Sequence, residues 1–229
     1  MQEHFYFTTN RAKLQKQYAA ILSFVSAQLS SIQIHLQRRN RHLLKQEDEV
    51  IITVHVLGKL LGFTSERAWH RFVIGNLFPK ALFPERSHCR ALGFAIKWVR
   101  HQLAKRGQHH AYAVVDSLPI ELCHSARMYR VTYNLGDKGY ISQKLQKKLY
   151  EEHRVAFWTT VRKNQRIRQS DAWKHWMKRK RKVVETVFSI LVDPYRITEI
   201  RANSVSGFET ALDGILLAYS LVVLGLVER

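Results

Sequence analysis

The sequence predicts an α/β protein in which a helical N-terminal region precedes a domain built on a small, mainly parallel sheet. Apolar residues recur at helical spacing through most of residues 11–105. Further along, the apolar residues form short runs bounded by turn residues, and a helical pattern separates two of these runs, as in a βαβ unit. Turn-forming residues lie where the pattern changes. We therefore place the helical region at residues 1–108 and the second domain at residues 109–229.

Four helices are expected in the N-terminal region. The second begins with the acidic residues 47–49, which the helix dipole favours at an N-terminus. Gly62 ends that helix, and Thr64 or Ser65 can cap the next one. The four helices are predicted over residues 11–39, 47–61, 65–78 and 88–105. In the fourth helix, the residues expected to face a core are Leu92, Ile96, Val99 and Leu103.

The second and third helices are joined by a tight turn that contains glycine. Such a pair is compatible with a helix-turn-helix that reads DNA, for which residues 1–108 would be the DNA-binding region. Any all-helical region also contains pairs of this kind, so ordinary packing of two helices remains the alternative.

The second domain is expected to contain both strands and helices. Its strands are predicted over residues 111–115, 131–135 and 155–161. Its helices are predicted over residues 141–153, 172–191 and 206–226. Because the first of these helices lies between two strands, those strands are expected to pair in parallel.

The charge balance is the strongest compositional signal. The chain has 37 Lys and Arg against 18 Asp and Glu, which gives a net charge of +19. So large an imbalance favours a polyanionic partner, with nucleic acid ahead of an anionic membrane surface. The two cysteines indicate a reducing compartment. The most apolar stretch, residues 215–227, is interpreted as too short to span a bilayer. We expect a cytoplasmic, nucleoid-associated protein that does not bind a membrane.

Three carboxylates stand out, and each has an ordinary structural explanation. Asp116 follows an apolar run and can cap a turn, Asp137 can be a simple turn residue, and Glu185 can pair with Arg181. Taken together, the three carboxylates indicate more than these separate structural roles. Both aspartates lie at strand ends, where open α/β sheets build their sites. Glu185 is expected beside an apolar stripe, at the rim of a core. Three converging carboxylates are suited to binding divalent metal ions.

The segment 162–182 is strongly basic, with ten Lys and Arg and a single acid. Tryptophans alternate with these cations, so the segment suits a phosphate backbone with indoles that stack on a base. The alternative for the indoles is core packing, which we favour for Trp176. The candidate DNA-binding residues are Arg162, Lys163, Arg166, Arg168, Trp173, Lys174, Lys178, Arg179, Arg181 and Lys182.

Three segments together resemble a known family. Residues 115–124 (VDSLPIELCH), 136–140 (GDKGY) and 181–189 (RKVVETVFS) are similar, in this order, to the signature segments of bacterial insertion-sequence transposases. The group is the one called insertion sequence nine-eighty-two, whose catalytic domain is of the DDE type. The resemblance extends over most of the chain from about Glu47 onward.

This resemblance implies an RNase H-like catalytic domain and metal-dependent cleavage and strand transfer at the ends of a mobile element. Asp116, Asp137 and Glu185 would be the catalytic residues and the metal ligands. They would hold two Mg²⁺ or Mn²⁺ ions about 3.5–4 Å apart. The implied partner is double-stranded DNA, both terminal inverted repeats and target DNA, bound by a homodimer.

The sequence departs from the family pattern between the first two acids. Asp116 and Asp137 are only 21 positions apart, too few for the three antiparallel strands and the helix that an RNase H-like fold has there. We therefore expect an internal deletion after Arg130 and a truncated catalytic domain. Two functions follow, an insertion-sequence transposase and a non-catalytic DNA-binding remnant that competes with the full-length enzyme.

Overall fold

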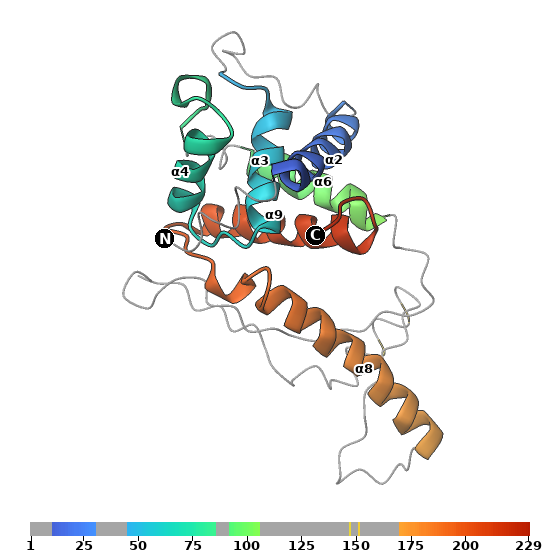
Figure 1. The fold of residues 1–229 in the computed structure, drawn as a ribbon. Coiled ribbons are helices and arrows are strands. Elements are labelled where there is room, and N and C mark those ends of the chain that lie inside the picture. The colour runs from blue at the N-terminus through green and yellow to red at the C-terminus, as the bar shows by residue number, and fades with distance from the viewer. Residues whose placement is uncertain (1–10, 31–44, 86–91, 106–146, 148–150, 152–169) are drawn as a thin grey trace. The chain divides into compact units, whose positions relative to one another are not determined.

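The structure is a computed structural model that describes residues 11–30, 45–85, 92–105, 147, 151 and 170–229. Every regular element in this part of the chain is a helix (Figure 1). The α-helices are α2 (Arg11–Leu29), α3 (Asp48–Leu60), α4 (Glu66–Asn76), α6 (Gly93–Lys105), α8 (Asp171–Val192) and α9 (Val205–Val223). Two short 3₁₀ helices are η3 (Lys80–Leu82) and η5 (Ile197–Glu199).

The described residues belong to two compact units. One unit, here called the helical body, contains α2, α3, α4, α6 and the chain from Ile190 onward, including α9. The other contains α8 up to Ser189. The last helix of the chain thus groups with the N-terminal helices, whereas the sequence was divided into two domains after residue 108.

Helix α3 forms the centre of the helical body. Acids occupy its first turn and Lys59 its last turn, as the helix dipole favours. Every residue from Ile51 to Leu60 is buried, because α2 covers one side of the helix and α9 another. The core residues predicted for the fourth helix are confirmed: Leu92, just before α6, and Ile96, Val99 and Leu103 within it are all buried.

The turn after α3 ends one helix and starts the next within a few residues. Gly62 has a φ of +79°, which favours glycine. Its N–H donates to the carbonyl of Lys59, and the N–H of Phe63 donates to that of Gly58, both at 3.0 Å, as in a Schellman motif. Ser65 then caps α4 by accepting a hydrogen bond from the N–H of Ala68 at 3.3 Å. The predicted serine cap is confirmed. The helix-turn-helix interpretation of this pair stays a prediction.

Helix α9 packs against α6 and α3 through small residues. A Cβ atom on Gly214 would lie 2.5 Å from Nε2 of His55, and one on Gly93 would lie 2.5 Å from Oγ1 of Thr210. These close approaches explain glycine at both positions. The buried carboxylate of Asp213 on α9 is paired with Arg100 on α6.

Within the described residues, α9 is the one helix long and apolar enough to cross a membrane. It has 19 residues and begins at Val205, close to the predicted helix 206–226, and it is longer than the apolar stretch 215–227 that was interpreted as too short to span a bilayer. Packing on two neighbours and the Arg100–Asp213 pair are features of a core helix, and 56% of its apolar window is buried.

The predicted strands 111–115, 131–135 and 155–161 lie outside the described residues, so the expected sheet is neither confirmed nor contradicted. Most of the predicted helix 141–153 lies there too. Lys147 and Glu151 are described, and both are helical. Their exposed side chains are 3.7 Å apart and form an i, i+4 ion pair, which agrees with a helix at this place.

Candidate nucleic-acid interface on helix α8

Helix α8 carries the only one of the three predicted catalytic residues that lies in the described part of the chain, namely Glu185. The helix begins at a serine cap: Oγ of Ser170 accepts a hydrogen bond from the N–H of Trp173 at 3.3 Å. Asp171 in the first turn lies 2.9 Å from Nζ of Lys174, whose hydrogen bond and charge hold the pKa of this carboxyl below its usual value. With 22 residues, α8 is about 33 Å long.

One side of α8 is apolar. The rings of Trp173 and Trp176 are stacked, with centroids 5.1 Å apart and an interplanar angle of 20°. Both indoles are half-buried, as are Val187 and Phe188, and Leu191 is buried. The sequence interpretation favoured core packing for Trp176; the half-buried stack is compatible with this packing and with partial access to a ligand.

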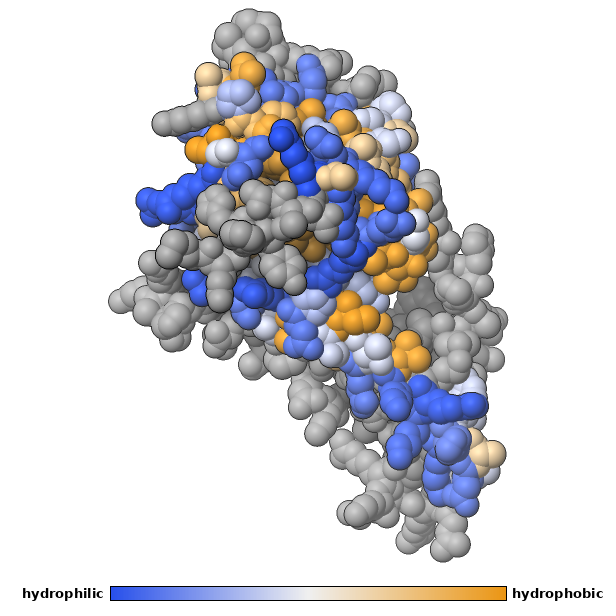
Figure 2. Space-filling view, in the orientation of Figure 1, coloured by the Kyte–Doolittle hydropathy of each residue, from blue (hydrophilic) through white to orange (hydrophobic). Residues whose placement is uncertain are grey.

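The other side of α8 is polar, and Glu185 lies there. Lys174, Lys178 and Lys182 precede it by eleven, seven and three residues, and these spacings place all four side chains on one face of an α-helix. All four are exposed. We call these residues the Glu185 face. Figure 2 shows hydrophilic side chains gathered over the N-terminal half of α8.

The expectation that Glu185 faces the rim of a core was wrong, because its side chain is exposed. Glu185 does border the apolar side of the helix, since the half-buried Phe188 lies three residues after it.

Arg179 is also exposed on α8, and it lies three residues before Lys182, about 60° around the helix axis from that lysine. It lies six residues before Glu185, which turns it about 120° away from the carboxylate. Arg179 therefore adjoins Lys182 but does not share a face with Glu185.

The remaining predicted site residues fall outside what the structure describes. They are Asp116, Asp137, Arg162, Lys163, Arg166 and Arg168. The backbone of Arg181 belongs to α8, but its side chain is not described, so its pairing with Glu185 stays a prediction. Within the described ranges, no three His, Cys, Asp or Glu side chains are grouped so that they could hold a metal ion. The exposed carboxylate of Glu185 is itself a suitable oxygen ligand for Mg²⁺.

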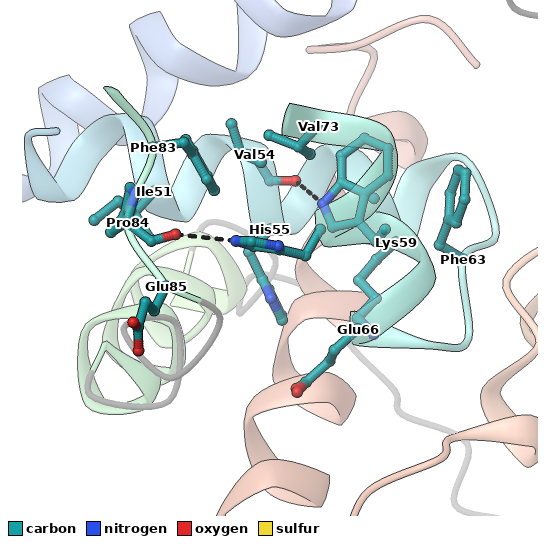
Figure 3. A pocket seen from close by; sticks show the side chains of 13 residues that line it. Ile51, Val54, His55, Lys59, Phe63, Glu66, Val73, Phe83, Pro84 and Glu85 are labelled. Carbon is teal, nitrogen blue, oxygen red and sulfur yellow. Dashed lines mark hydrogen bonds between the residues drawn. The ribbon is translucent and has the colours of Figure 1, made fainter. Parts of the chain in front are cut away.

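The helical body contains a small pocket between α3, α4 and residues 83–85 that the sequence did not indicate (Figure 3). Its cavity is about 40 Å³, and most of its lining is apolar. Nε1 of Trp69 donates to the carbonyl of Val54 at 3.0 Å. The buried polar residues His55 and Lys59 of α3 also reach this pocket. Their positions i and i+4 within an apolar run were the signal that marks them as neighbours on one helix face.

Comparison with known proteins gives one match. A family model described as "Transposase DDE domain" matches residues 131–205, about a third of the chain. The chain is similar to this domain over the segment that contains Asp137 and Glu185, and Asp116 precedes the matched segment. Neither the comparison with curated proteins nor that with solved structures found a match.

Proposed function

We propose that this chain is a DDE transposase of an insertion sequence, of the group called nine-eighty-two, that binds the ends of its element and cleaves and joins DNA. The observation that carries the proposal is the match of residues 131–205 to a transposase DDE domain. That segment contains two of the three acids singled out from the sequence, in the expected order.

The proposed catalytic residues are Asp116, Asp137 and Glu185, which together would bind Mg²⁺ or Mn²⁺. Carboxylate oxygens are the ligands that these hard cations prefer. When bound, the cations supply Lewis acidity at the phosphorus that is attacked. The residues of this chain would hold and orient the ions, Glu185 from an exposed face of α8.

The proposed DNA contacts are the cations of residues 162–182. Exposed Lys174, Lys178, Arg179 and Lys182 on α8 support a phosphate-binding surface. The stacked pair Trp173 and Trp176 lies on the other, apolar side of α8. The proposed assembly is a homodimer on terminal inverted repeats and target DNA, in a cytoplasmic, nucleoid-associated location.

The residue at which the match to the transposase DDE domain begins favours a second function. It starts at residue 131, directly after the expected deletion site at Arg130, and it leaves Asp116 outside. A chain that lost residues there would lack part of the catalytic domain. It would then be a non-catalytic DNA-binding remnant that competes with the full-length transposase for element ends.

One experiment separates the two functions. The purified protein is incubated in Mg²⁺ with labelled DNA that carries the genomic sequences flanking its gene. A transposase nicks or joins this DNA, and Asp116→Ala, Asp137→Ala and Glu185→Ala each abolish the reaction. A remnant binds the same DNA without cutting it. Cleavage that survives all three substitutions would refute the proposed catalytic residues.

A further inference from the structure

Helix α9 is apolar on the side that packs into the helical body and also on the opposite side. The residues of the packed side recur at helical spacing and are buried, among them Ala211, Ala218 and Leu221. Alternating spacings of four and three residues mark a second row, none of whose members is buried. This row, here called the outer face of α9, consists of Val205, Glu209, Leu212, Leu216, Tyr219 and Val223.

Five of the six residues of the outer face are apolar, where an ordinary surface helix would be polar. Val205 and Val223 are 48% and 62% exposed, and the apolar residues between them are half-buried. Ser220 at the edge of the row donates its hydroxyl to the carbonyl of Leu216 at 2.8 Å, so this hydroxyl has a partner within the helix. A helix that is apolar all round is normally covered on every side. The outer face is therefore a contact surface that the packing of the described helices leaves open.

The spacing of the outer face is that of a helix that packs lengthwise on another helix. Apolar residues that recur every 3.5 positions on average keep one seam in contact with a partner helix over several turns. Helix α9 has 19 residues, so the face is about 28 Å long and about 10 Å wide. A patch of about 300 Å² on a monomer is commonly functional. The spacing therefore indicates that another helix covers this face.

The charge of α9 indicates which helix that is. Of the six α-helices that the structure describes, α9 alone contains no Lys or Arg. With a net charge of +19, two copies of the chain repel each other over most of their surfaces. They can approach each other most closely where cations are absent. The same lack of cations makes the outer face unsuited to phosphate groups, whether of DNA or of an anionic lipid.

We propose that the outer face of α9 binds the outer face of a second copy of this chain, as an antiparallel helix pair with a twofold axis near Leu216. In this arrangement the Glu209 side chains of the two copies are about 21 Å apart along the helices, more than the Debye length of about 10 Å. A parallel pair would place these two carboxylates side by side, where they repel. The pair specifies the surface of the homodimer proposed above, and it requires neither DNA nor metal.

The size of the face sets the expected strength of the dimer. About 300 Å² in projection is less than the about 800 Å² that each partner buries in a complex of standard size. We therefore expect a reversible dimer with a dissociation constant in the micromolar range. Sedimentation equilibrium of the purified full chain, without DNA or Mg²⁺, measures this constant.

Substitutions on the outer face should change the dissociation constant in both directions. Val223→Glu and Leu216→Glu should each raise it by at least about ten-fold, because a carboxylate would enter an apolar contact. Glu209→Leu should lower it by about five-fold, because it replaces the single charge of the row with an apolar residue. Phe94→Glu is the control: Phe94 of α6 is 66% exposed but lies on another helix, so the constant should not change. Thermal melts establish that each variant is folded.

The antiparallel direction is tested separately. About a twofold axis at Leu216, Val223 lies opposite Glu209, so Val223→Lys should weaken the dimer much less than Val223→Glu does. In a variant whose two native cysteines are replaced by serine, Leu216→Cys should form a disulfide-linked dimer under mild oxidation. Val205→Cys should not, since these positions would be about 33 Å apart. Cross-linking through Val205→Cys but not through Leu216→Cys would overturn the proposed pair.

The remaining outcomes separate this interface from the proposed reaction. A protein that stays monomeric at all concentrations would overturn the interface, as would a dimer that the outer-face substitutions leave unchanged. Binding of the monomer to phosphatidylserine vesicles would also overturn it, because lipid would then cover the face. A dimer that responds as expected but never cleaves DNA would keep the interface and refute the reaction. Cleavage of DNA by a protein without this dimer would do the reverse.

Discussion

Arg100 of α6 and Asp213 of α9 form an ion pair inside the helical body, with Nε and Oδ1 2.6 Å apart. Their side chains are 23% and 10% exposed. The two residues are 113 positions apart in the sequence, so the pair ties the last helix to the N-terminal helices. Removing one partner would leave a nearly buried charge without its counter-ion.

Arg100→Met should lower the free energy of unfolding by about 2–3 kcal/mol, since it leaves the carboxylate of Asp213 buried and unpaired. Urea denaturation of the purified protein measures this. The control is Lys16→Met, which breaks the Lys16–Glu228 pair, 3.0 Å long and 69% and 75% exposed. An exposed pair of this kind should contribute less than about 1 kcal/mol. Equal effects of the two substitutions would show that burial of the Arg100 pair is unimportant.

His55 should make the stability of the helical body depend on pH. Burial, and then the charge of Lys59, lower the pKa of His55 to about 3, although the carbonyl of Thr210 raises it slightly. In the unfolded chain the pKa is about 6.5. Between these values the unfolded chain binds a proton that the folded protein excludes. The contribution of neutral His55 to the free energy of unfolding is therefore fully present above about pH 6.5 and decreases as the pH falls toward 3.

From pH 7 to pH 5 this residue alone should lower the free energy of unfolding by about 2 kcal/mol. Urea titrations at the two pH values measure the change. His55→Leu fills a similar space without a titrating group, so the variant should lose that part of the pH dependence. If the wild type and the variant lose the same amount of stability, another group is responsible.

Two glycines provide a matched pair of substitutions. In Gly214→Ala the new Cβ would lie 2.5 Å from Nε2 of His55 and 3.3 Å from Cγ of Lys59, so either the buried His55 ring or α9 would have to shift. We expect a loss of about 1–3 kcal/mol of stability. Gly75→Ala on α4 meets nothing within 4 Å and should stabilise the protein by about 0.5–1 kcal/mol. Thermal melts of both variants measure the difference, and a neutral Gly214→Ala would contradict the close helix contact.

The helices of the body were predictable because their signals are local. The apolar spacing that marked residues 92, 96, 99 and 103 depends only on the helical period, and the Ser65 cap depends on the few residues that follow it. The pairing of Arg100 with Asp213 was not predictable, since no local pattern links α6 to α9. For the same reason, a boundary chosen from turn residues and a change of pattern carried no information on the packing of α9 against α3 and α6.

The site was predictable only in part for a related reason. The order of its three acidic segments is a property of the sequence, and the DDE match agrees with it for Asp137 and Glu185. The exposure of Glu185 depends on what packs against α8, which its place beside the apolar residues of the helix does not determine. Whether the three acids meet depends on contacts between distant segments, which neither spacing nor composition determines.

Metal binding gives the last prediction, with a readout that does not depend on catalysis. If Asp116, Asp137 and Glu185 bind Mg²⁺ in the folded protein, adding Mg²⁺ should raise the melting temperature. Free Mg²⁺ at a hundred times its Kd should stabilise the protein by about 2.7 kcal/mol.

Glu185→Gln removes one ligand charge and should greatly reduce the rise in melting temperature that Mg²⁺ causes. Glu209→Gln, which alters an exposed acid of α9, should keep it. NaCl at the same ionic strength controls for screening. An identical Mg²⁺ shift in the wild type and in Glu185→Gln would remove Glu185 from the proposed metal ligands.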